Sequence, residues 1–204
     1  MDFSLSEEQI AIFDLAHQFG QEKIAPHSLD WEKSGNIPKT LWKDIASLGF
    51  GGLYVSEKNG GSGLSRLDAT LVFEALSMSC PSVAAFLSIH NMCVSMIDKY
   101  GSSELIDKIL PDALKMDNVI SYCLTEPGSG SDASALKTRA EKTNNCYTLT
   151  GTKSFISGGG YSDSYLVMCR TGESGPQGIS TIYLEDGSAG LSFCLLYTSA
   201  AADE

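Results

Sequence analysis

The chain has 204 residues and a formal net charge of −11 at pH 7, and this length fits one or two domains. Apolar residues make up 43% and charged residues 19% of the sequence, a globular composition that excludes an intrinsically disordered chain. The acidic balance argues against nucleic acids and anionic membranes as general partners, because their phosphates would be repelled.

The spacing of the cysteines and histidines predicts no metal site. No Cys-x-x-Cys pair occurs, and His17, His27 and His90 lie far apart. Cysteines among apolar neighbours are typical of buried thiols and fit a reducing compartment. No charged start leads into an apolar run and no apolar stretch reaches about 18 residues, so we predict neither a secretory signal nor a membrane span.

The first 118 residues show helical patterns. Ser6 and Gln9 form a capping box, and Leu5 precedes it as a staple for Ile10. This helix then has one apolar face, and Pro26 closes the segment. Further helices are predicted after Pro38 up to Gly49, over 67–78, over 82–100 and over 103–116, with a glycine-rich loop at 59–63. The 82–100 helix is apolar nearly all round, which predicts that it is buried between the others.

Beyond residue 118 the apolar residues alternate or form short runs. Strands are predicted over 119–124, 146–150, 154–157, 165–170 and 179–185, separated by turn clusters. Because no helices intervene, an antiparallel sheet or barrel is favoured over a parallel one. We therefore predict an α+β fold, with an all-helical N-terminal domain over 1–118 and a small antiparallel β-domain over 119–193.

The segment 122–132 is the candidate for chemistry. A strand leads into a turn in which Pro127 fixes its own backbone while Gly128 and Gly130 allow a close approach or a positive φ. Its main-chain amides and hydroxyls would suit a flat polar heterocycle or a phosphate. The same composition also suits a plain strand-exit loop, and no lysine follows the glycines as in a phosphate-binding loop.

Two motifs resemble the acyl-CoA dehydrogenase family. Leu124-Thr125-Glu126-Pro127 with Gly130-Ser131-Asp132 resembles its flavin loop, and Gly151-x-Lys153-x-Phe155-Ile156-Ser157 its second flavin element. Segments 5–9 and 59–63 resemble the family's opening and its glycine loop, so the resemblance extends from residue 2 to about 193. Segments 88–92, 121–132 and 168–172 resemble the branch that oxidises short branched-chain acyl-CoA esters, such as isobutyryl-CoA in valine breakdown.

The resemblance implies an FAD site with two walls. The first would be Tyr122, Cys123, Leu124, Thr125, Glu126, Pro127, Gly128, Ser129, Gly130 and Ser131, and the second Phe155, Ile156 and Ser157. Leu124 and Thr125 would meet the pyrimidine edge of the flavin, the Ser157 hydroxyl its N5 atom, and Ser131 also the acyl-CoA. The implied reaction removes a proton from Cα and a hydride from Cβ, and the electrons pass to an electron-transfer flavoprotein.

The resemblance also implies a third, helical domain that carries the catalytic base and the main contacts of a homotetramer. We therefore predict no catalytic residue within this chain. The expected compartment is the cytoplasm for a bacterial protein, or the mitochondrial matrix for a eukaryotic one whose transit peptide is missing here. Residues 194–204 resemble a translated sequencing adapter, which predicts a non-native tail.

Two other functions stay open on the sequence. In the first, the chain keeps the fold but acts only as a binding or interaction module. In the second, it belongs to a nucleic-acid-associated branch of the same superfamily. The charge of −11 and the lack of a basic patch count against the second alternative.

Overall fold

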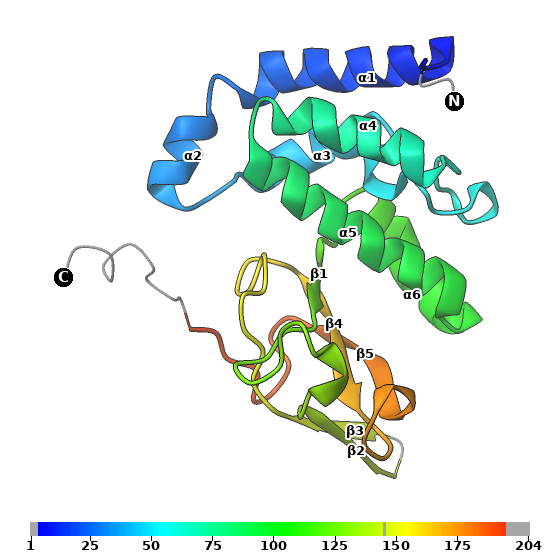
Figure 1. Ribbon diagram of the computed structural model, residues 1–204, viewed down its shortest axis with the longest axis vertical. Helices are drawn as coiled ribbons and strands as arrows, with labels where there is room; N and C mark the ends of the chain where they lie inside the picture. The colour runs from blue at the N-terminus through cyan, green and yellow to red at the C-terminus, as the bar shows by residue number, and fades with distance from the viewer. Residues whose placement is uncertain (1–3, 145, 195–204) are drawn as a thin grey trace. The chain divides into compact units, whose positions relative to one another are not determined.

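The computed structural model describes residues 4–144 and 146–194 (Figure 1). The chain divides into two compact units, with the division between Tyr122 and Cys123. The first is helical and the second is built on a β-sheet, which confirms the predicted α+β fold. Of the tail predicted over 194–204, Cys194 is described and exposed, and the rest lies outside the described residues.

The helical unit follows the predicted pattern with one addition. Its helices are α1 (Glu7–Phe19), α2 (Ser28–Ser34), α3 (Lys39–Ser47), α4 (Arg66–Ser77), α5 (Pro81–Tyr100) and α6 (Ser103–Leu114). The predicted capping box is present, since the amides of Gln9 and Ser6 each donate to the other's side chain, at 3.2 and 3.1 Å. The addition is α2, which buries no residue and ends at Gly35 in a left-handed conformation, so no apolar stripe marks it in the sequence.

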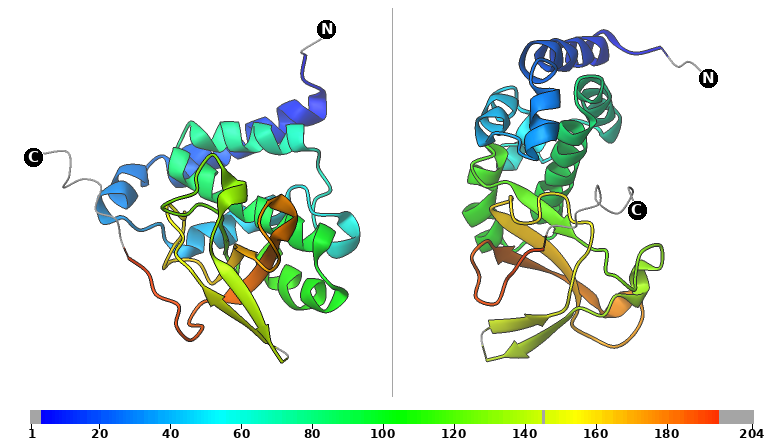
Figure 2. Two further views of the ribbon diagram at one scale, coloured as in Figure 1. Left: turned by 60° about the horizontal axis from the view of Figure 1, so that its bottom comes forward. Right: turned by 90° about the vertical axis from the view of Figure 1, so that its left-hand side faces the viewer.

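The core of this unit gathers around α5, which packs against α4 and α6 (Figures 1 and 2). Helix α5 contributes nine buried residues, which confirms its predicted central place. The Phe86 ring of α5 lies 5.0 Å from that of Trp42 in α3. The predicted glycine loop is tightly folded, and a Cβ at Gly61 would collide with the Val55 carbonyl oxygen.

His90 is fully buried on α5 and joins it to two other segments of the helical unit. The amide of Ile120 donates to His90 Nδ1 at 3.1 Å, so the ring proton must reside on Nε2, which lies 3.0 Å from the Ala113 carbonyl oxygen. Burial lowers the pKa of His90 to about 4, although hydrogen bonds to main-chain oxygens oppose this shift. The neutral ring is therefore part of the folded structure.

We expect the helical unit to lose stability as the pH falls from about 6.5 to about 4. The unfolded chain takes up a proton at His90 over that range while the folded chain does not, so up to about 3 kcal/mol is lost. Urea unfolding followed across this range measures the loss. His90→Gln cannot titrate and should flatten the dependence, whereas His27→Gln, at an exposed position, should leave it unchanged. An equal slope for wild type and His90→Gln would contradict the prediction.

The five-stranded sheet, to which the first unit contributes residues 120–122, is mixed. Its strands are β1 (Ile120–Cys123), β2 (Arg139–Thr143), β3 (Cys146–Thr150), β4 (Ser164–Arg170) and β5 (Ile179–Glu185). The order is β1-β4-β2-β3, and β5 also pairs with β4. Pairs β2–β3 and β4–β5 are antiparallel, but β2 and β4 are parallel, so the prediction of a purely antiparallel sheet is wrong at this pair. The connection 151–163 carries the chain back after β3, so β4 runs in the direction of β2.

Two strand assignments also differ from the prediction. Strand β2 is absent from the predicted set, because four of its five residues are exposed and several are charged. The strand predicted over 154–157 does not form, because Phe155 adopts a left-handed φ of 57°, which a strand cannot contain. Within the described part of the chain, no helix combines the length and apolar character needed to cross a membrane.

Candidate functional site

The segment after β1 forms a tight turn. Leu124 and Thr125 follow the end of the strand, and the amides of Glu126 and Ser129 then donate to each other's carbonyl oxygens at 3.0 and 3.1 Å. Pro127 and Gly128 form the exposed tip. The buried Ser129 donates from its hydroxyl to the Asp132 carbonyl oxygen at 2.6 Å, which fixes the chain as it leaves the turn.

Neither glycine of this turn is required by the fold of the unit itself. Gly128 and Gly130 do not adopt a positive φ, which leaves a close approach to the main chain as the remaining alternative of the sequence prediction. A Cβ at either position would meet nothing within 4 Å among the described residues. The glycines therefore leave the main chain bare toward open space, as a flat ligand lying against the turn would need.

The second predicted segment lies beside the first. The amide of Ser154 donates to the Thr125 carbonyl oxygen at 2.8 Å, and Lys153 Nζ donates to the Leu124 carbonyl oxygen at 2.9 Å. These two bonds join residues nearly thirty positions apart into one surface. The structure thus brings together the two motifs that carry the family resemblance.

Phe155 presents a bare aromatic ring next to this junction. Its side chain is 77% exposed, and its backbone has a φ of 57°. A bulky residue in this conformation is strained, and such strain clusters at ligand-binding segments. The next residue, Ile156, instead packs against the buried cluster of Cys123, Tyr165 and Val167, and Ser157 is exposed.

Glu126 is held as an anion by several donors. Its carboxylate accepts hydrogen bonds from the amides of Lys137 at 2.6 Å and Thr138 at 2.9 Å, and from Lys153 Nζ at 2.9 Å. Burial by itself would raise the pKa of Glu126, but the hydrogen bonds from Thr138, Lys137 and Lys153 outweigh it and lower the pKa to about 2. A carboxylate this stable is a poor proton acceptor, which argues against Glu126 as a general base.

Three further residues of the predicted flavin site are Tyr122, Cys123 and Ser131, and burial changes the pKa of the first two. Burial raises the pKa of the Cys123 thiol to about 12, although Lys153 opposes this shift, so the thiol stays protonated. Burial also raises the pKa of Tyr122, the last residue of the helical unit. Ser131 is exposed.

The two units match two domains of one protein family. The N-terminal domain of acyl-CoA dehydrogenases matches residues 6–117, and the middle domain matches residues 121–204. The chain belongs to the acyl-CoA dehydrogenase family.

Similar proteins of this family are known from several organisms. The mitochondrial isobutyryl-CoA dehydrogenases of Bos taurus and Dictyostelium discoideum are 50% and 52% identical to the chain; each match covers 93% of the chain but 45% and 46% of those proteins. Among solved structures, an FAD complex of PigA has a TM-score of 0.86 at 30% identity, covering 93% of this chain and 51% of that one. A structure described as the electron transferring flavoprotein of Acidaminococcus fermentans has a TM-score of 0.85 at 35% identity, covering 93% of this chain and 50% of that one. The chain spans about half the length of the curated relatives it matches.

Lys153 is the site residue that sequence reasoning missed in this acyl-CoA dehydrogenase chain. The sequence places it within the motif Gly151-x-Lys153-x-Phe155 but assigns it no role. The available signal is a lone lysine in an otherwise uncharged segment, 151–160. A buried partner for that charge is not identifiable from the sequence, because Glu126 precedes it by 27 residues.

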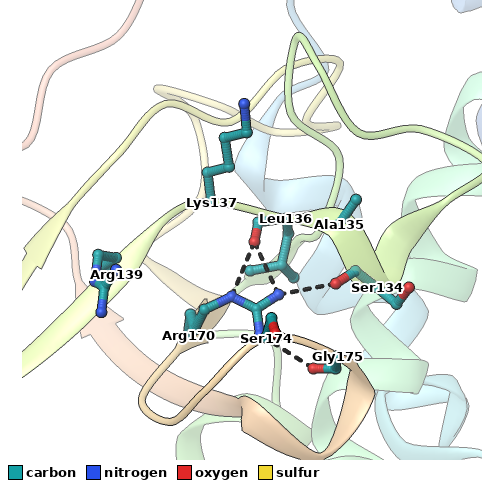
Figure 3. Close-up of a pocket in the computed structure, with 8 residues that line it drawn as sticks. All are labelled: Ser134, Ala135, Leu136, Lys137, Arg139, Arg170, Ser174 and Gly175. Carbon is teal, nitrogen blue, oxygen red and sulfur yellow. Dashed lines mark hydrogen bonds between the residues drawn. The ribbon is translucent and has the colours of Figure 1, made fainter.

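A shallow pocket in the β-unit of this acyl-CoA dehydrogenase chain surrounds Arg170 (Figure 3). Lys137 and Arg139 also line it, which gives it a basic character. The Arg170 guanidinium, however, donates five hydrogen bonds to main-chain oxygens of Ser134, Leu136, Glu173 and Gly175, at 2.7 to 3.2 Å. All five of its N–H groups are thereby used, so Arg170 holds two loops together and has no donor left for an anion.

Proposed function

We propose that the chain is the N-terminal and middle part of an FAD-dependent acyl-CoA dehydrogenase that oxidises a short branched-chain acyl-CoA, such as isobutyryl-CoA, to the 2-enoyl-CoA. The observation that carries this proposal is the junction of the 124–131 turn with the exposed Phe155 segment. A bare turn on one side and an aromatic ring on the other suit a planar heterocycle.

The residues present fit FAD, which when bound would supply the hydride acceptor. The open flank at Gly128 and Gly130 leaves room for a ring to lie against the main chain. Phe155 offers an aromatic face for stacking, while the hydroxyls of Thr125 and Ser157 would orient the ring by hydrogen bonds. The chain's own part is thus to bind and orient the cofactor and to exclude water from one side of it.

The substrate and the redox partner follow from the resemblance. Two similar proteins are named isobutyryl-CoA dehydrogenases, which supports a short branched acyl chain, and we place Ser131 against the acyl-CoA. An electron-transfer flavoprotein is the proposed electron acceptor, supported by the similar Acidaminococcus fermentans structure that carries this name. We further infer a homotetramer for the full-length protein, in the mitochondrial matrix if it is eukaryotic and in the cytoplasm if it is bacterial.

Titration of the purified chain with FAD tests the cofactor. Binding should quench flavin fluorescence and add structure to the visible absorption band near the flavin maximum, as expected for a ring moved from water to a protein site. Titration of FAD with free N-acetyltryptophanamide in place of the chain controls for stacking on exposed aromatic residues. Absence of FAD binding would favour the alternative of a non-catalytic module.

Changing Thr125 to Val should weaken FAD binding about 5- to 150-fold. The substitution keeps the shape of the side chain but removes the hydroxyl, and an unpaired polar edge costs about 1–3 kcal/mol. The Thr125 carbonyl, which accepts from Ser154, is retained, so the two segments stay joined. Fluorescence titration measures the affinity, with Thr148→Val on exposed strand β3 as the control. An unchanged affinity would contradict the role of Thr125.

A further inference from the structure

An ion pair lies beneath the two segments of the proposed flavin site. Lys153 Nζ is 2.9 Å from Glu126 Oε1, and the two side chains are 10% and 7% exposed. The pair and its three main-chain partners, which are the Leu124 carbonyl and the amides of Lys137 and Thr138, are called the clamp below. Each charge of the clamp therefore binds main chain as well as its opposite charge.

The stability of the fold alone does not explain why an ion pair is buried here. Removing two charges from water carries a desolvation penalty that their mutual attraction does not reliably recover, and apolar side chains of similar volume often serve stability equally well. A buried ion pair instead specifies geometry, because both charges need partners at fixed positions. Here the partner on the lysine side is the carbonyl of Leu124, in the first wall of the site.

The clamp also acts on Phe155, two residues after Lys153. Between them, the Ser154 amide is bonded to the Thr125 carbonyl oxygen, and after Phe155 the Gly159 amide donates to the Ile156 carbonyl oxygen at 3.0 Å. A strained left-handed residue persists when the surrounding structure fixes it from both sides. Lys153 and Ser154 provide that restraint on the N-terminal side of Phe155.

We propose that Lys153 and Glu126 are positioning residues for the flavin ring: they fix the Leu124–Thr125 main chain and, through Ser154, the Phe155 ring, without binding the cofactor themselves. This inference rests on the proposed function of these segments as an FAD site. It assigns a role to the family motif's lysine that is distinct from direct contact with the ligand.

The experiment compares three variants of the complete chain with wild type. Lys153→Met removes the charge and the donors but keeps a stem of similar length, and Glu126→Gln is isosteric and removes the negative charge. Lys43→Met is the matched control, because Lys43 forms an exposed ion pair with Asp117 at 2.7 Å in the helical unit. For each variant we measure FAD affinity by fluorescence, the visible circular dichroism of bound FAD, and urea unfolding without FAD.

Lys153→Met and Glu126→Gln should each weaken FAD binding about 10- to 100-fold, by analogy with the loss of residues that orient metal ligands. They should also change the circular dichroism of the FAD that still binds at saturation, a signal that lower stability alone would not move. A further variant, Lys153→Arg, keeps charge and donors and should recover part of both. Lys43→Met should match wild type in affinity and spectrum.

The outcomes distinguish failure of this inference from failure of the proposed function on which it rests. If wild type does not bind FAD, the proposed function fails and the inference with it. If wild type binds while folded Lys153→Met and Glu126→Gln bind with unchanged affinity and spectrum, the inference alone is overturned. Should Lys153→Met not fold, Glu126→Gln decides, because its amide oxygen keeps one of the two main-chain bonds, which in wild type go to different oxygens, from Thr138 to Oε1 and from Lys137 to Oε2.

Discussion

The purified 204-residue chain, supplied with FAD, is expected to show no oxidation of isobutyryl-CoA with an artificial electron acceptor. The reaction requires a carboxylate that removes the Cα proton, and a missing general base typically costs about 10²- to 10⁴-fold in rate. Glu126 is the carboxylate of the flavin turn, but three hydrogen bonds and a pKa of about 2 prevent it from accepting that proton. We therefore propose that the base lies outside these residues.

Reduction of a dye in the presence of isobutyryl-CoA measures this activity. A chimera that joins residues 1–193 of this chain to the C-terminal half of the Dictyostelium discoideum relative should recover turnover, because that relative is 52% identical over the shared part. Turnover by the chain alone, free of host dehydrogenase, would show that the base lies within these residues.

Changing Arg170 to Met should destabilise the β-unit by about 3 kcal/mol. The substitution removes five hydrogen bonds to main-chain oxygens and leaves acceptors of Leu136 and Glu173 without their charged donor. Loops 133–136 and 173–175 would no longer be tied to the end of β4. Urea unfolding monitored by near-ultraviolet circular dichroism measures the effect on the tertiary structure.

Arg139→Met is the matched control, because Arg139 lines the same pocket from an exposed position on β2. Its loss should change the free energy of unfolding by less than about 0.5 kcal/mol. Equal destabilisation by the two variants would mean that the pocket's charge, and not the hydrogen bonds of Arg170, supports the loops.

Helices with both a capping signal and an apolar face are predictable from sequence. Helix α5 combines Pro81 at its start, Gly101 at its end and apolar residues around most of its surface. Helix α2 has no buried residue and no side-chain cap, so its local sequence offers nothing to detect. Strand β2 escapes prediction for a related reason: charged residues such as Arg139 and Lys142 form a strand there because β3 pairs with them.

The sequence predicts the two motifs of the site, but it does not predict how the two segments contact each other. Within the motif at 151–157 a strand is predicted over 154–157, since Phe155 and Ile156 favour extended structure. Tertiary bonds from Ser154 to Thr125 and from Lys153 to Leu124 override that preference. The partnership of Lys153 with Glu126 depends on this same long-range junction, so no local pattern could reveal it.

At position 155, selection for stable folding and selection for flavin binding would favour different residues. Glycine, asparagine and aspartate adopt a positive φ at low cost, whereas phenylalanine does so at a cost of about 1–3 kcal/mol. A library randomised at this codon and sorted for folding would therefore drift toward small residues, and the same library sorted for flavin retention would keep aromatic ones. We therefore infer that the phenylalanine at position 155 serves flavin binding at a cost in stability.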